Sequence, residues 1–199
     1  AYNKLNELSP LEFSSFENFS LDYYSETPCK DGEQSPRERM SLILSFCRKY
    51  AENFKKDSPS LLLTGNTGLG KTHLSLAIAR EAIEKGFGVI YTSTQNMILN
   101  MEKEKFKSYY SENESEKLYT DCDLLIIDDL GTEYATAFSS AAIYNVINSR
   151  IMRNKPTIIS TNFSMRELEK YYTQRMVSRI IGNNIRLEFI GSDIRQKRI

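Results

Sequence analysis

The hydrophobic pattern changes its period along the chain, and these changes divide the chain into helices and strands. The first clear helix begins at Ser35-Pro36-Arg37-Glu38, where a capping box coincides with proline at the first helical position. Behind it, apolar side chains recur at spacings of three and four and define one buried face: Met40, Ile43, Leu44, Cys47, Ala51 and Phe54. Residues 1–34 contain aromatic side chains but no sustained period. We therefore expect residues 1–34 to form an N-terminal linker or extension and residues 35–199 to form the folded domain.

From residue 60 onward, short apolar runs alternate with amphipathic segments. Strands are predicted at Ser60–Thr64, Gly88–Thr92, Leu124–Ile127, Thr157–Thr161 and Ile185–Ile190. Helices are predicted at Lys71–Glu84, 94–120, Ser139–Met152 and 173–181, with a further capping box at Ser164-Met165-Arg166-Glu167. Strands that alternate with helices imply right-handed crossovers, so the pattern predicts an α/β fold whose mostly parallel sheet is covered on both faces.

The strongest chemical signal is a complete GxxxxGK[ST] motif between a predicted strand and a predicted helix. Its glycines let successive N–H groups surround phosphate oxygens, and the start of the helix adds a favourable dipole. Lys71 is expected to reach the β- and γ-phosphates, and the Thr72 hydroxyl to bind magnesium. The candidate ATP-binding residues are Gly65, Asn66, Thr67, Gly68, Leu69, Gly70, Lys71, Thr72 and His73. For His73, packing at the start of the helix is the simpler interpretation, and a bare glycine turn is the weaker alternative for the whole motif.

Two carboxylates, Asp128 and Asp129, stand at the end of the apolar run Leu124–Ile127. The carboxyl ends of parallel strands line the ligand crevice of such sheets, so both acids are expected to face the nucleotide. Asp128 suits the magnesium shell, directly or through water. Asp129 suits a carboxylate that orients the attacking water, which favours hydrolysis over mere phosphate binding. A solvated Asp-Asp turn is the alternative.

Further polar residues near the other predicted elements are weaker candidates. Asn162 follows the strand Thr157–Thr161, where its amide could polarise the water or touch the γ-phosphate, although capping of the strand is a plain alternative. Arg175 and Arg179 lie four apart and hence on one helix face, and Arg195 follows the last strand. Without further evidence, the simplest interpretation of each arginine is an ordinary solvated charge on the surface.

The composition excludes several classes of protein. The chain has 199 residues with 40% hydrophobic and 26% charged residues, as in a globular domain, and it has no apolar run long enough for a bilayer and no signal peptide. Basic and acidic residues balance at 26 each, so any nucleic-acid contact must be a local patch. Three scattered cysteines and one histidine argue against zinc and favour the reducing cytoplasm. The chain begins with Ala1, and we expect a partner-binding segment upstream of it.

The motifs together resemble a known family. The Gly65–Thr72 loop, IIDDLGTE (126–133), ISTN (159–162), QRMVSRIIG (174–182) and SDIR (192–195) are similar to AAA+ ATPases of the DnaC/DnaI helicase-loader type, within the IstB-like ATP-binding superfamily. The resemblance covers roughly residues 13–199, including FENFSLDYY (16–24). It implies a P-loop NTPase with an AAA+ core: a parallel five-stranded sheet flanked by helices, here without a full lid domain. ATP and Mg²⁺ are the implied cofactors.

The resemblance also implies roles for individual residues. Asp128 and Asp129 correspond to Walker B, and Asn162 to sensor 1. Arg179 resembles an arginine finger that acts in trans on a neighbour's ATP, and Arg195 resembles sensor 2. Many AAA+ proteins have Asp-Glu in Walker B; the shorter Asp129 leads us to expect slow hydrolysis that assembly stimulates.

The implied partners are a replicative helicase, single-stranded DNA and further copies of the chain, with no membrane. Residues 93–120 resemble the helical insertion of initiator and loader ATPases. Cations and aromatic side chains that suit single-stranded DNA occur there, at Lys103, Lys105, Lys107, Tyr109 and Tyr110. Alternating charges on an exposed helix explain the same lysines equally well.

Two other functions remain open. A transposase-helper ATPase of the IstB type would have nearly the same C-terminal half, and its genomic neighbour would be a transposase rather than a helicase or primosome gene. A small-molecule P-loop kinase or signalling NTPase would instead have an acceptor pocket and arginines that act within one chain.

Overall fold

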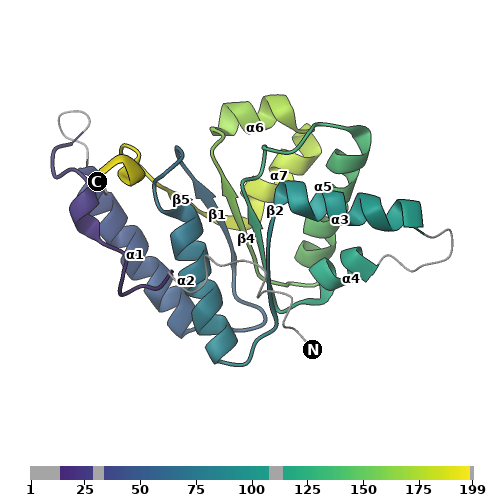
Figure 1. Ribbon diagram of the computed structural model, residues 1–199, viewed down its shortest axis with the longest axis horizontal. Helices are drawn as coiled ribbons and strands as arrows, with labels where there is room; N and C mark the ends of the chain where they lie inside the picture. Colours follow the sequence, from purple (N-terminus) through teal and green to yellow (C-terminus); the bar gives the residue numbers. More distant parts are fainter. Residues whose placement is uncertain (1–13, 29–33, 108–113, 198–199) are drawn as a thin grey trace.

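A five-stranded parallel sheet forms the centre of the protein (Figure 1). The structure is a computed structural model, and it describes residues 14–28, 34–107 and 114–197. The strands are β1 (Ser60–Thr64), β2 (Val89–Ser93), β3 (Leu124–Asp128), β4 (Thr157–Thr161) and β5 (Asn184–Glu188). Their order in the sheet is β2-β3-β4-β1-β5, and every neighbouring pair is parallel. The predicted α/β fold is confirmed, and β1 lies inside the sheet with β4 between it and β3.

Helices cover both faces of this sheet (Figure 1). One face carries α1 (Pro36–Glu52) and α2 (Lys71–Glu84); the other carries α3 (Thr94–Lys107), α4 (Glu114–Asp121), α5 (Ala137–Met152), α6 (Met165–Tyr171) and α7 (Gln174–Gly182). Because successive strand residues point to opposite faces, Leu61 and Leu63 pack under the first layer while Leu62 packs under the second. The same alternation in β3 and β4 divides the core into two layers.

Several predicted boundaries differ from the structure. The single helix expected over 94–120 is two helices, α3 and α4, and residues 108–113 lie outside the described residues. Helix α5 begins at Ala137 rather than Ser139, because Thr136 caps it: the Thr136 hydroxyl accepts from Ser139 N at 3.0 Å while Ser139 Oγ accepts from Thr136 N at 2.9 Å. Strand β5 ends at Glu188 rather than Ile190, and the chain turns at Gly191, where φ is +131°.

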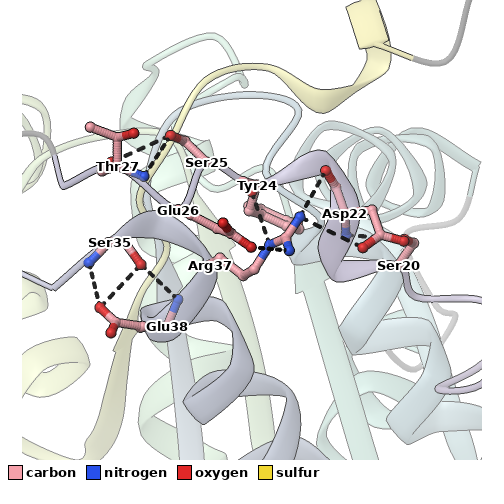
Figure 2. A network of polar contacts seen from close by, with 9 residues as sticks. All are labelled: Ser20, Asp22, Tyr24, Ser25, Glu26, Thr27, Ser35, Arg37 and Glu38. Atoms are coloured by element: carbon pink, nitrogen blue, oxygen red, sulfur yellow. Dashed lines mark hydrogen bonds and ion pairs between the residues drawn. The ribbon is translucent and has the colours of Figure 1, made fainter.

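Residues 14–28, predicted as part of an N-terminal linker or extension, pack against the folded domain. Phe16, Phe19 and Tyr24 are buried in the core layer of α1 and α2. Arg37 at the start of α1 holds the segment in place (Figure 2): Nη1 donates to Glu26 Oε1 at 2.5 Å and Nε donates to the Tyr24 carbonyl at 3.3 Å. The aromatic spacing lacked a period because the segment is irregular, with one short 3₁₀ helix at Leu21–Tyr23.

None of the helices in the described ranges combines the length and apolarity needed to cross a bilayer.

Candidate nucleotide-binding site

The glycine-rich loop joins β1 to α2 and is shaped by its close neighbours. Gly68 and Gly70 have φ of +72° and +87°, which L side chains rarely adopt. A Cβ atom at Gly68 would lie 1.8 Å from Asp193 Oδ1, and one at Gly70 would lie 2.7 Å from Phe19 Cε2. The positive φ therefore favours glycine at both positions, and the side chains of Asp193 and Phe19 would have to move to admit a Cβ atom.

A cleft opens beside this loop at the carboxyl ends of the strands. Its lining residues are Phe19, Ser20, Tyr23, Thr67, Gly68, Leu69, Gly70, Lys71, Thr72, His73, Asp129, Asn162, Ile194 and Arg195. Most of the residues that were predicted from the sequence to bind ATP thus lie together around this cleft. Gly65 and Asn66 line a second cleft, which shares Leu69 and Asn162 with the first. Phe19, Ser20, Tyr23 and Ile194 were not proposed as site residues. For the first three, the available sequence signal was the aromatic run FENFSLDYY (16–24).

Lys71 is buried at the base of this cleft. Its Nζ donates to the carbonyls of Gly65 at 2.6 Å and Asn66 at 2.7 Å, and to Asn162 Oδ1 at 2.8 Å. Burial lowers the pKa of Lys71 to about 8, against the opposing attraction of Asp129 and Asp128. A buried ammonium whose hydrogen-bond partners are neutral is a strong attractor for phosphate.

Asp128 is surrounded by hydroxyl groups. Thr72 Oγ1 donates to Asp128 Oδ2 at 2.9 Å, Tyr91 OH donates to the same oxygen at 2.7 Å, and Ser160 Oγ donates to Oδ1. The Thr72 hydroxyl and the Asp128 carboxylate supply adjacent hard oxygen atoms. They fit Mg²⁺, which takes few protein ligands and keeps water or phosphate oxygens for the rest.

Asp129 has an unusual backbone conformation for a residue other than glycine, with φ of +55°. Its N–H donates to Ser160 Oγ at 2.9 Å, and its Oδ1 accepts from Asn162 Nδ2 at 3.5 Å. Burial and the neighbouring Asp128 raise the pKa of Asp129. One serine of β4 therefore holds both acids. Ser160 and Tyr91 were not among the predicted site residues. The available signal for each was a polar residue inside an otherwise apolar strand.

The segment after β5 lies on the outer side of the loop. Ile194 N donates to the Gly68 carbonyl at 3.0 Å, and Arg195 Nη2 donates to Thr67 Oγ1 at 2.8 Å. Asp193 raises the pKa of Arg195 by hydrogen bonding and charge. On the other side, His73 Nε2 lies 2.8 Å from the Ser15 carbonyl, and its ring meets Phe19 edge-on at 5.3 Å. These contacts support packing as the main role of His73, although it also lines the cleft.

Arg179 is the one proposed catalytic residue that does not line this cleft. It lies half-buried on α7, which packs against α5 and β5 on the opposite face of the sheet from α2. Arg175, one turn earlier, is exposed and stacks over the Tyr144 ring at 5.1 Å. Within the described residues, Arg179 thus lies away from the nucleotide site of its own chain.

The proposed DNA-binding residues are only partly described. Lys103 and Lys105 are exposed on α3, and Lys105 Nζ lies 4.9 Å from the centre of the Phe138 ring. Tyr109 and Tyr110 lie outside the described residues, as does the side chain of Lys107.

The fold and the site together define a P-loop nucleotide-binding protein with an AAA+ type of core. A family model described as IstB-like ATP binding protein matches residues 48–196, and the chain belongs to that family. The replicative helicase loader DnaC of Escherichia coli strain K12 is 28% identical over 155 residues, which are 77% of this chain and 63% of the relative. The chain thus spans less than two thirds of that relative's length.

Solved structures show the same fold. A crystal structure of the DnaC helicase loader matches with a TM-score of 0.70 at 24% identity, covering 88% of this chain and 98% of the other. The replication initiator DnaA bound to AMPPCP and single-stranded DNA matches with a TM-score of 0.71 at 24% identity, covering 90% of this chain and 50% of the other.

Proposed function

We propose that the protein is an AAA+ ATPase that acts as a loader of a replicative helicase. ATP would switch its assembly and its contact with single-stranded DNA. Membership of an ATP-binding family and similarity to DnaC over 77% of the chain support this function. The contact geometry of Asn162 supports hydrolysis most directly, since its side chain joins Lys71 at 2.8 Å to Asp129 at 3.5 Å beside the glycine loop.

The residues of the cleft divide the chemistry among them. The triphosphate would lie along the loop N–H groups, and Lys71 would exchange the Gly65 and Asn66 carbonyls for phosphate oxygens. Thr72 and Asp128 would hold Mg²⁺, which neutralises phosphate charge. Asp129 would orient the attacking water, with Asn162 beside it. The Asp129 side chain is one methylene shorter than that of glutamate, so slow turnover is expected.

The chain would need a neighbour to complete this site. Arg179 lies on α7, away from its own cleft, which favours action on the ATP of an adjacent copy. Hydrolysis would then depend on assembly. The replicative helicase is proposed as the partner from the similarity to DnaC, and single-stranded DNA is proposed to contact Lys103 and Lys105 on α3.

A comparison of two arginines on one helix tests this function. Arg179→Ala is expected to abolish assembly-stimulated hydrolysis and to leave ATP affinity near that of the wild type, whereas Arg175→Ala, one turn away, should retain both. Loss of ATP affinity in Arg179→Ala would contradict action in trans. Sizing with a non-hydrolysable ATP analogue, with and without an oligonucleotide and purified helicase, tests the loader role.

A transposase-helper ATPase is the second candidate, because the family model carries the IstB description. Association with a transposase, and none with a replicative helicase, would favour it. Both candidates share the nucleotide site, so the Arg179 test applies to either.

A further inference from the structure

A buried carboxylate, Glu133, follows the Walker B strand and takes no part in the nucleotide cleft. Only 4% of Glu133 is exposed. Its Oε2 accepts from Gly131 N at 3.0 Å, and its Oε1 accepts from the Tyr172 hydroxyl. The Tyr171 hydroxyl donates to the backbone carbonyl of Glu133. Within the described ranges, the hydrogen-bond partners of this carboxylate are uncharged. Burial of a carboxylate without a cationic partner usually costs stability, which suggests that Glu133 has a functional role.

Tyr172, the partner of Glu133, connects two helices. It follows the last residue of α6, and its N–H donates to the Leu168 carbonyl at 2.9 Å. The next residue, Thr173, caps α7 by accepting from Met176 N at 3.4 Å. Because the Tyr172 ring is buried and its hydroxyl is bound to Glu133, the start of α7 is attached to the loop after β3. Arg179 lies on the same helix, five residues beyond Gln174 and about 7.5 Å along the axis at 1.5 Å per residue.

The other end of this loop is attached to the nucleotide site. Leu130 N donates to the Ser160 carbonyl at 2.8 Å, directly after Asp129. Gly131 lies against the Phe163 ring so closely that a Cβ there would be 2.6 Å from Cε2. Phe163 follows Asn162 in the chain and meets the Tyr171 ring at 5.2 Å. A continuous set of contacts therefore runs from the acids and Asn162 to the start of α7.

We propose that Glu133 and Tyr172 form a positioning pair that sets the placement of α7, and with it the reach of Arg179 toward the ATP of a neighbouring copy. The inference rests on the proposed action of Arg179 in trans. Neither residue touches nucleotide; both act through the helix that carries the arginine. The pair acts in the subunit that donates the arginine; in the subunit that hydrolyses ATP, Asp129 and Asn162 keep their own contacts with Ser160 and Lys71.

Mixed assemblies separate these two roles. Subunits with Arg179→Ala keep an intact nucleotide site but supply no arginine, whereas subunits with Asp129→Asn supply Arg179 and bind ATP but do not hydrolyse it. Mixing them should restore hydrolysis. Adding Tyr172→Phe to the Asp129→Asn donor should reduce the restored rate about tenfold, because small misplacements of a catalytic group have large effects on rate. Adding it to the Arg179→Ala acceptor should leave the rate nearly unchanged.

Matched variants control for stability. Tyr50→Phe removes another buried hydroxyl, which donates to the Pro59 carbonyl at 2.8 Å in the opposite core layer, and should be silent in donor and acceptor alike. Glu133→Gln keeps the size of the side chain and should repeat the donor-only loss if Tyr172→Phe does not fold. Two results would overturn the proposal. The first is a donor with Tyr172→Phe that restores the same hydrolysis rate as the donor without it. The second is a loss of rate that is equally large whether Tyr172→Phe is placed in the donor or in the acceptor. If the unmodified mixture restores nothing, the action of Arg179 in trans is itself wrong.

Discussion

Asn162 Oδ1 accepts a hydrogen bond from Lys71 Nζ at 2.8 Å, across 91 positions of sequence. Strand β4 makes this contact possible, because it lies between β1, which leads into the glycine loop, and β3, which ends at the Walker B acids. The Asn162 amide nitrogen faces Asp129 at 3.5 Å. One carboxamide thus links the group that would bind phosphate to the group that would orient water.

Replacement of this carboxamide should affect turnover more than binding. Asn162→Ala is expected to lower kcat about 100-fold, as loss of a preorganised polar group commonly does, while the Kd for ATP changes little. Steady-state hydrolysis and ATP titration measure the two effects. Asn145→Ala, at an exposed position of α5, is the control and should retain both. Normal turnover in Asn162→Ala would remove Asn162 from its role.

The Tyr91 hydroxyl should tune magnesium binding through Asp128. It donates to Asp128 Oδ2 at 2.7 Å, and loss of a partner behind a metal ligand typically weakens metal affinity about 10- to 100-fold. Tyr91→Phe is therefore expected to raise the Mg²⁺ concentration for half-maximal ATP hydrolysis by at least about tenfold. Tyr134→Phe, where the tyrosine is 85% exposed, serves as control. An unchanged Mg²⁺ dependence in Tyr91→Phe would contradict this positioning.

ATP binding should take up protons near pH 8. Because burial lowers the pKa of Lys71 to about 8, the ammonium of the free protein loses its proton as the pH rises through that value. The phosphates of bound ATP favour the charged form of Lys71 and raise its pKa again, so the affinity for ATP should fall above pH 8. At pH 8, binding should take up roughly half a proton at Lys71.

Calorimetry in buffers of different ionisation enthalpy measures this uptake. Lys71→Arg should bind without this uptake, since arginine stays charged throughout the range. Equal proton uptake by the wild type and Lys71→Arg would assign it to another group.

Arg37 contacts Tyr24 and Glu26 (Figure 2), and these contacts should support the wall of the cleft that Phe19, Ser20 and Tyr23 form. Arg37 binds the carbonyl of Tyr24 and the carboxylate of Glu26, so Arg37→Ala should loosen the segment and weaken ATP binding several-fold. Global stability should change by only about 1 kcal/mol, because the pair is partly solvated. ATP titration and hydrogen exchange over residues 14–28 test both. Arg80→Ala, at an exposed ion pair with Glu84, is the control. Unchanged ATP affinity would show that the wall contributes nothing to binding.

Local signals explain what could be predicted from the sequence. The glycine loop, the capping box at Ser35 and the two acids at the end of β3 each depend on neighbouring residues alone, and all of them appear where the pattern indicated. Parallel strands with helical crossovers followed from the alternation of periods.

The remaining features depend on contacts between distant segments. Ser160 meets Asp128 and Asp129 only because β3 and β4 pair in register, and Tyr91 reaches Asp128 from β2. Arg150 was not singled out at all: it is fully buried and donates to carbonyls of Cys122 and Pro156, which spacing cannot reveal. The aromatic segment before α1 has no period because its contacts, rather than a helix, determine its shape.

Titration calorimetry of ATP in millimolar Mg²⁺ shows whether the Gly65–Thr72 loop holds a metal-bound triphosphate. The wild type should bind one ATP per chain, Lys71→Ala should lose the binding heat, and Lys117→Ala, at an exposed position of α4, should bind as the wild type does. Folded wild-type protein that produces no binding heat, or equal binding by Lys71→Ala, would contradict the account.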